Sequence, residues 1–260
     1  MADSRTLTFL GTGTSVGVPM IGCDCPVCTS TNPRNHRYRS SVLIGTERGK
    51  ILIDTTPELR LQLLREKIML VHAVMFTHYH ADHLFGFDDL RLFPKYLNGP
   101  LPVYCSAEVE TVIRNAFPYV FRSEYEDMPA GAIPKLVMRR IDSEPFEVLG
   151  ETVTPIPLIH SRYNVFGFRI GDLAYCTDTN YIPESSYERL EGVKTFIIDA
   201  LRFKPHPAHF SLDEALESIR RVGPETAYLT HMSHDFDYDK LSADLPSHVK
   251  MAYDGLQITF

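Results

Sequence analysis

A single stretch of seven residues, T-H-Y-H-A-D-H at positions 77–83, constrains this chain more than any other feature. It follows the apolar run A-V-M-F, which predicts a buried strand, so its polar side chains lie where that strand ends. His78 and His80 alternate and face one side while the backbone is extended, whereas Asp82 and His83 come after the chain turns. Three imidazoles and a carboxylate this close together can bind two neighbouring metal ions. A polar surface loop is the simpler alternative, but it does not explain this density of metal-binding side chains.

The spacing H-x-H-x-D-H resembles the signature of the metallo-β-lactamase-fold hydrolases. Members of that family take their remaining metal ligands from isolated positions further along the chain, each at the end of a strand. His160, Asp178 and His231 each follow an apolar, strand-like run, and they occur in the order that the resemblance demands. Any one of them alone is more often a structural residue. Three in order after a complete first motif favour a ligand set.

Cysteines form a second cluster, with the spacing C-x-C-x-x-C at Cys23, Cys25 and Cys28. Three thiolates this close together can bind one tetrahedral zinc ion if a fourth ligand comes from elsewhere, and such a closed site is structural. His36 is one candidate, but His234 is favoured because it would join this loop to the far end of the chain and close a very long loop. Three free cysteines in a loop are the alternative.

Composition places the chain among globular proteins. Its 260 residues are 44% hydrophobic and 23% charged, which suits one large domain over residues 1–260 with a zinc-binding loop at about residues 19–40. The opening M-A-D-S-R lacks the apolar segment of a signal peptide, and no run approaches the ~18 apolar residues of a membrane span. We therefore expect a cytoplasmic protein without membrane contact. Its five cysteines, three of them clustered, do not suit a secreted disulfide framework.

The charge balance bears on the class of substrate. A formal net charge of −7 argues against a large nucleic-acid surface, because contacts with many phosphates need an excess of lysine and arginine. A small phosphorylated substrate is compatible with it, since two divalent cations would reverse the local field. The glycines at positions 11, 13 and 17 do not open a helix and no G-K-[ST] follows, so they predict a tight loop near the metal site and not a nucleotide-binding loop.

Three features each have two interpretations. The basic run Arg34 to Arg39 is either a solvated loop or a surface that faces a phosphate. The aromatic segment at residues 112–134 is either a flap over the site or a surface excursion. Asp54, at the end of a predicted strand, either orients a metal-bound histidine or caps the next helix, and we favour the first because the resembled superfamily often places an acid there.

Alternating strand and helix patterns predict a mixed α and β fold. Ser211 and Glu214 have the spacing of a capping box, and a helical apolar stripe follows them. Turn-forming pairs at residues 171–172 and 254–255 each predict a hairpin between flanking strands. Composition and periodicity lead no further than this class. The resemblance implies an α/β (α+β) fold, the four-layer αββα sandwich of the metallo-β-lactamase superfamily.

Within that superfamily the chain resembles the cyclic phosphodiesterases of the carbon–phosphorus lyase pathway and their relatives. The opening L-G-T-G, the cysteine loop, the R-Y-R patch and the late motifs T-H-M-S-H and Y-D-G carry this resemblance over nearly the whole chain. Relatives of this kind also indicate a homodimer. The form G-F-D-D-L-R at residues 86–91 departs from the pattern and leaves the substrate open. The resemblance implies that one metal binds His78, His80 and His160, that the other binds Asp82, His83 and His231, that Asp178 bridges them, and that a structural zinc binds Cys23, Cys25, Cys28 and His234.

Such a site predicts metal-dependent hydrolysis. Two divalent ions, zinc or manganese, about 3.5–4 Å apart would share a hydroxide and stabilise the attacking and leaving oxygens at phosphorus. We therefore expect a phosphodiesterase that acts on a small cyclic or nucleotide-like diester, with Asp82 and Asp178 in its catalytic centre. An acyl hydrolase, either a lactonase or a thioesterase, is the alternative, and a tRNA 3′-end endonuclease is a variant of the first interpretation. A binding protein without turnover is disfavoured because no ligand is missing.

One histidine outside the metal set completes the predicted site. His209 follows the strand that ends at Asp199 and precedes the capping box, so the chain fixes it near the edge of the site. His206 lies between two prolines and has no evident anchor. The resembled phosphodiesterases carry a histidine before this helix, and an imidazole can give a proton to a departing alkoxide. We predict that His209 is catalytic, against the alternative of a surface histidine that merely precedes a helix.

Overall fold

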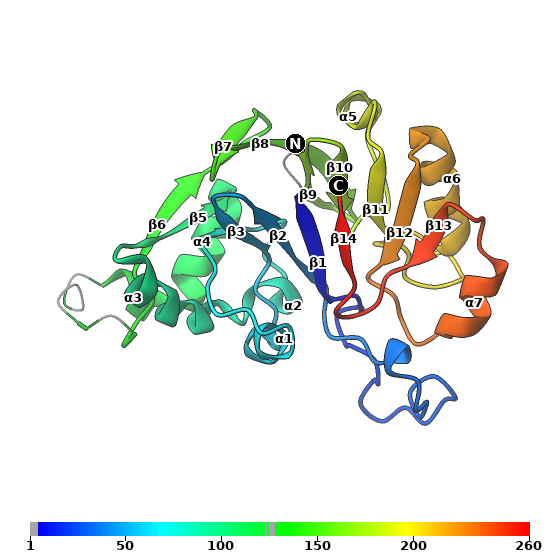
Figure 1. Cartoon of the computed structure of the whole chain (residues 1–260), viewed down its shortest axis with the longest axis horizontal. Helices are drawn as coiled ribbons and strands as arrows, with labels where there is room; N and C mark the ends of the chain where they lie inside the picture. The colour runs from blue at the N-terminus through cyan, green and yellow to red at the C-terminus, as the bar shows by residue number, and fades with distance from the viewer. Residues whose placement is uncertain (1–4, 123, 125–127, 130) are drawn as a thin grey trace.

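The computed structural model describes residues 5–122, 124, 128–129 and 131–260, which form two seven-stranded sheets (Figure 1). The first sheet has the order β14 (Gln257–Thr259), β1 (Thr6–Gly11), β2 (Ser41–Thr46), β3 (Gly49–Ile53), β4 (Ala73–Met75), β5 (Leu101–Cys105), β6 (Leu136–Arg140). The second has the order β13 (Val249–Met251), β12 (Thr226–Thr230), β11 (Thr195–Asp199), β10 (Leu173–Cys176), β9 (Tyr163–Ile170), β8 (Glu151–His160), β7 (Phe146–Val148).

Parallel pairing occurs in one half of each sheet. It joins β3 to β6 in the first sheet and β10 to β13 in the second. Parallel strands end at the same edge of a sheet, so the residues that follow β3 and β4 gather at one edge, as do those that follow β10, β11 and β12. These two edges carry the candidate site.

Helices cover the outer face of each sheet, so the molecule has the four layers αββα that the resemblance implied (Figure 1). Apolar side chains between the sheets form one core, which includes Phe9 and Phe168, and two further clusters fill the space under the helices. No described helix is long and apolar enough to cross a membrane. The α-helices are α1 (Leu59–Arg65), α2 (Ala81–Leu84), α3 (Phe93–Leu97), α4 (Ala107–Ala116), α5 (Glu184–Leu190), α6 (Leu212–Val222) and α7 (Tyr238–Asp244), and the 3-10 turns are η1 (Pro33–Asn35), η2 (Phe87–Leu92) and η3 (Pro118–Phe121).

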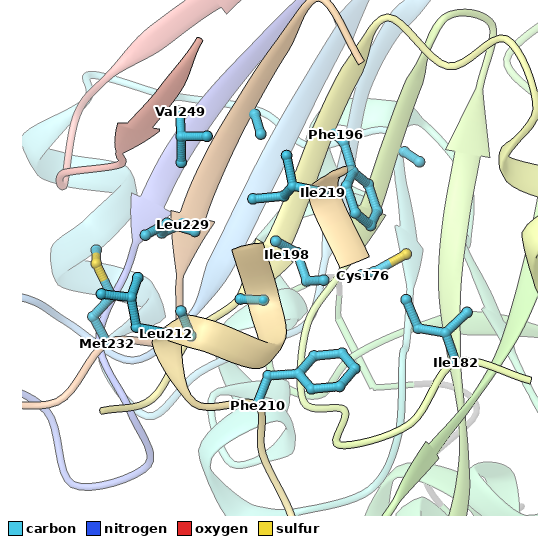
Figure 2. Close-up of a cluster of buried hydrophobic side chains, with 14 of the residues drawn as sticks. Cys176, Ile182, Phe196, Ile198, Phe210, Leu212, Ile219, Leu229, Met232 and Val249 are labelled. Atoms are coloured by element: carbon cyan, nitrogen blue, oxygen red, sulfur yellow. The ribbon is translucent and has the colours of Figure 1, made fainter. Parts of the chain in front are cut away.

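Helix α6 begins at the predicted capping box. The Ser211 hydroxyl accepts from the Glu214 backbone N–H, and the Glu214 carboxylate accepts from the Ser211 N–H, so both bonds of the box are present. Leu212 and Ile219 pack on the second sheet, in a cluster that also buries Phe210 (Figure 2). Because Phe210 is buried directly before the helix, the residues just ahead of it are held in place.

One of the two predicted hairpins is present. Residues 171–172 join β9 to β10, which are antiparallel neighbours. The hairpin at residues 254–255 was wrongly predicted, because β13 lies parallel to β12 in the second sheet and β14 lies antiparallel to β1 in the first. The Asp254 carboxylate instead accepts from the Thr12 hydroxyl and from the Tyr38 N–H, both at 2.8 Å. Each strand completes the edge of a different sheet, and this long-range pairing overrides the local turn preference.

Candidate functional site

All seven predicted ligands of the hydrolytic site lie together where the strand-end edges of the two sheets meet. Four come from the turn after β4 and from the short helix α2, His160 is the last residue of β8, and the other two follow β10 and β12. They form two compact groups, in each of which the potential ligand atoms all lie within 4.8 Å of one another. The first group contains His78, His80 and His160, and the second contains Asp82, His83, Asp178 and His231.

Asp178 lies between the two groups. Its Oδ2 is 3.2 Å from His83 Nε2 in the second group and 3.9 Å from His78 Nε2 in the first. Its Oδ1 is 3.0 Å from His231 Nδ1. A carboxylate in this position can reach an ion in either group, which is the geometry that a bridging ligand requires.

The atoms of these groups fit divalent metals. The buried atoms Nε2 of His78, Nε2 of His83, Oδ2 of Asp82 and both ring nitrogens of His231 make no hydrogen bond within the described chain. Buried polar atoms normally have a partner, so several unpaired ones in one place fit a site that binds a cation. Burial lowers the pKa of His231 to about 3, which keeps its ring in the neutral form that binds metals.

Asp54, which follows β3, orients one of these histidines. Its Oδ2 accepts from His83 Nδ1 (2.8 Å) and from the Thr77 hydroxyl (2.7 Å), and its Oδ1 accepts from the Thr77 N–H (2.9 Å). Because Nδ1 makes this bond, Nε2 of His83 is the ring nitrogen that faces the other candidate ligands. Asp54 therefore orients His83, as the first interpretation requires, and it does not cap the next helix, because Glu58 is the residue that precedes α1.

Three residues of the site have a left-handed backbone. The angle φ is 66° at Asp54, 53° at Asp178 and 57° at His231, and each residue lies within two residues of the end of a strand. Non-glycine residues pay on the order of 1–3 kcal/mol for such conformations, which cluster at functional sites. The sharp turns place each side chain at the strand edge and begin the next segment of chain.

His209 lies against the two groups of candidate ligands and is paired with Asp199, the last residue of β11. Its Nδ1 donates to Asp199 Oδ2 (2.8 Å), and its ring stacks on the His231 ring at 4.6 Å between centroids. Burial by itself lowers the pKa of His209, but the hydrogen bond and the negative charge of Asp199 outweigh burial and raise it. Burial raises the pKa of Asp199 to about 6, so this carboxylate is largely ionised near neutrality. His209 is thus held as a partly protonated imidazole.

Asp199 was missed as a member of the site. The sequence placed it at the end of a buried strand, the same position that singled out the other candidates, so that signal could have found it. The second contact that was missed is a backbone one, since His160 Nδ1 donates to the Ala208 carbonyl oxygen at 2.6 Å. No side-chain pattern reveals such a bond.

The cysteine cluster lies around His234, as predicted. The distances from His234 Nδ1 to the sulfur atoms of Cys23, Cys25 and Cys28 are 3.2, 3.4 and 3.6 Å. Ligands of one tetrahedral zinc ion are about 3.5 Å apart at the usual zinc–sulfur and zinc–nitrogen lengths, so these four side chains fit that ion. His36 points elsewhere, because its Nε2 donates to the Ser30 carbonyl oxygen at 2.9 Å.

The basic loop has a structural part in this arrangement. Arg37 is fully buried and donates to the carbonyl oxygens of Ser233 (3.0 Å) and Phe236 (2.7 Å), on either side of His234. Arg39 is paired with Glu58. A phosphate-facing role therefore does not fit Arg37, and the solvated-loop interpretation does not fit it either. Residues 123, 125–127 and 130 of the proposed flap lie outside the described residues.

We expect Cys25→Ala protein to unfold at a clearly lower temperature, with a stability loss of about 3 kcal/mol or more, since removal of a metal site is among the few changes with large effects. The protein should also lose the one metal that resists chelation. Thermal unfolding and elemental analysis would measure both. Asp24→Ala, an exposed neighbour in the same loop, is the control. Cys25→Ala protein with unchanged stability and its tightly held metal would refute the zinc assignment.

Comparison with known proteins agrees with this geometry. A family model described as Beta-lactamase superfamily domain matches residues 49–232. The chain is 37% identical over 253 residues to an octanoyltransferase from Porphyromonas gingivalis (strain ATCC BAA-308 / W83), with 96% of this chain but 50% of that protein covered. It thus spans half the length of that relative.

Two solved structures extend the comparison. A new diphosphatase from the PhnP family is 40% identical, with a TM-score of 0.91 and 98% of both chains covered. The zinc-bound PqqB from Methylobacterium extorquens is 18% identical, with a TM-score of 0.78, and covers 97% of this chain and 99% of its own. At that identity the second comparison shows a shared fold and no more.

Proposed function

We propose that this chain, which belongs to the β-lactamase superfamily of metal-dependent hydrolases, hydrolyses a small phosphodiester or diphosphate of cyclic or nucleotide-like structure. The observation that carries the proposal is the position of Asp178 between two ligand groups, because two ions held side by side suit in-line displacement at phosphorus. The likeness to a diphosphatase at 40% identity supports phosphorus as the reacting centre.

Seven residues of the chain would hold two divalent ions in the groups described above. Bound ions would supply an acidified water and stabilise the charge on the phosphoryl oxygens. The first group offers only imidazole nitrogens, which suit zinc, whereas the carboxylates of Asp82 and Asp178 suit manganese as well. Asp54 fixes the ring of His83, and the Ala208 carbonyl fixes the ring of His160, so these candidate ligands are oriented before a metal binds.

His209 would act as the general acid. Its Nδ1 is occupied by Asp199, so Nε2 is the nitrogen that can give a proton to the substrate. In the proposed reaction a water that has released one proton to solvent forms a bond from its oxygen to phosphorus, and the bond from phosphorus to the leaving oxygen breaks. The proton on His209 Nε2 then passes to that leaving oxygen.

Acyl hydrolysis is the second candidate, and a specific observation favours it. The chain is 37% identical to half of a protein named an octanoyltransferase, so an acyl substrate belongs in any test. The same two ions could polarise a carbonyl group. The protonated His209 would serve either reaction, so the choice depends on turnover and not on the site alone.

The proposal is tested by turnover of a substrate panel. Metal-loaded protein should hydrolyse bis(p-nitrophenyl) phosphate with a kcat/KM on the order of 100-fold above that for an octanoyl thioester or a lactone, because two ions held side by side would stabilise in-line displacement at phosphorus. Protein treated with a chelator should lose this activity and regain it when metal is restored. A higher rate on the thioester or lactone would replace the proposal with the acyl-hydrolase alternative.

A further inference from the structure

The loop that joins β11 to α6, residues 200–211, is tied to the candidate site at two points. His160 Nδ1 donates to the Ala208 carbonyl oxygen (2.6 Å), and His209 Nδ1 donates to Asp199 Oδ2 (2.8 Å). Backbone hydrogen bonds between its two ends close the loop at its base. The tip of this loop is therefore held beside the candidate ligands.

Arg202 lies inside this loop and braces it. Its Nε donates to the Lys204 carbonyl oxygen (3.1 Å), and its Nη2 donates to the Pro205 carbonyl oxygen (2.8 Å). A guanidinium group has five N–H donors, so several are left for a further acceptor. Partial burial and the bonds to the loop fix the position of this positive charge.

His206 is anchored, contrary to the prediction from the sequence. Its Nδ1 accepts from the Ala208 N–H at 3.3 Å, so the proton of the neutral ring is on Nε2 and is available to a ligand. The His206 ring lies 5.3 Å from the His209 ring. Burial, then the charges of His209 and Arg202, lower the pKa of His206, so its ring is a neutral donor near neutrality.

We infer that His206 and Arg202 bind a negatively charged phosphate on the leaving part of the substrate, directly beyond the bond that is broken. The inference rests on the proposed function, in which His209 gives its proton to the leaving oxygen. The leaving group must then lie against His209, and the next donors in the same loop belong to His206 and Arg202. A diphosphate, whose leaving group is itself a phosphate, fits this order of donors.

This arrangement selects between substrates of the same reaction. Donors that are fixed in position and partly buried bind a charged acceptor well. When the leaving group is neutral, the same donors lose their hydrogen bonds to water and form none in exchange. A neutral leaving group therefore gains nothing from His206. If His206 and Arg202 only hold the loop, their removal would instead slow every substrate by the same factor.

The experiment compares two thymidine 5′-phosphate derivatives whose leaving groups have similar basicity. One is the p-nitrophenyl ester, with a leaving group that has no second phosphate, and the other is the diphosphate that releases methyl phosphate. In His206→Ala protein the ratio of kcat/KM for the diphosphate to that for the ester should fall on the order of 10- to 100-fold, the worth of a hydrogen bond to a charged group. His206→Gln, which restores an N–H donor, should recover part of the ratio.

Lys204→Ala is the matched control, because it removes an exposed cation from the same loop and should leave the ratio unchanged. Inhibition by methyl phosphate gives a second measurement, and it should weaken in both His206→Ala and Arg202→Lys proteins. Equal losses on both substrates, with unchanged inhibition, would overturn the inference while leaving the proposed function intact. Wild-type protein that hydrolyses neither substrate would overturn the proposed function and the inference with it.

Discussion

Asp178→Ala protein is expected to lose hydrolysis of an activated phosphodiester by on the order of 10³-fold or more, because metal ions contribute several kcal/mol of transition-state stabilisation. The Asp178 carboxylate contacts candidate ligands of both groups through its two oxygens. Removing it leaves the histidines in place but takes away the group that would hold two ions at a fixed separation. Steady-state kinetics on bis(p-nitrophenyl) phosphate, with elemental analysis of the same samples, would measure the loss.

A matched control is available near the start of the same strand. Asp172 precedes β10, has a half-buried side chain and pairs with Lys194 at 2.7 Å, at the end of the strand opposite to the ligand groups. Asp172→Ala protein should keep both its activity and its metals. Full activity in Asp178→Ala protein would contradict a mechanism with two metals, whatever its metal content.

His209→Ala protein is expected to keep its fold and metals but to lose on the order of 10² to 10⁴ in rate on an unactivated diester, the usual contribution of a positioned acid. The loss should be much smaller on a nitrophenyl ester, because nitrophenolate leaves without a proton. Asp199→Asn should reproduce part of this pattern, since it removes the carboxylate that holds His209 Nδ1. Kinetics on the two esters would measure both variants.

His248→Ala is the control for this prediction, because His248 is exposed and lies in the connection between α7 and β13. The two esters also distinguish a general-acid role of His209 from a role as a metal ligand. One ring nitrogen of His209 lies with His160 and Asp178 in a third group, all within 4.8 Å, so His209 could itself hold a metal. Equal losses on both esters together with a lost metal would favour that role and contradict the acid.

The sequence predicted which side chains lie together at the candidate site, because most of them lie at or just after the end of a buried strand, and that local pattern needs no knowledge of the whole fold. His78, His160 and His231 come from three strands in two sheets, yet a single rule found them. The rule works because the carboxyl ends of neighbouring parallel strands meet at one edge. The resemblance, and not the pattern, supplied the four-layer architecture.

The features that were predicted wrongly or missed depend on tertiary contacts that no local sequence pattern shows. The pair at residues 254–255 has the local preference of a hairpin, but the strand after it pairs with β1 at the other end of the chain, while the strand before it pairs with β12 in the other sheet. The anchor of His206 is a backbone N–H in a loop whose shape follows from the bond between His160 and Ala208. The burial of Arg37 depends on carbonyl oxygens beside His234, which no local pattern marks.

The most direct measurement of the central claim is the anomalous diffraction of crystals loaded with zinc or manganese. Two peaks about 3.5–4 Å apart are expected in the hydrolytic site, with Asp178 in contact with both, and a third peak is expected at Cys23, Cys25, Cys28 and His234. The same data on Asp178→Ala crystals should show at most one peak in the hydrolytic site. A single peak there in the wild-type protein, or one bound by His209 in place of His231, would contradict the two-metal site proposed for this chain.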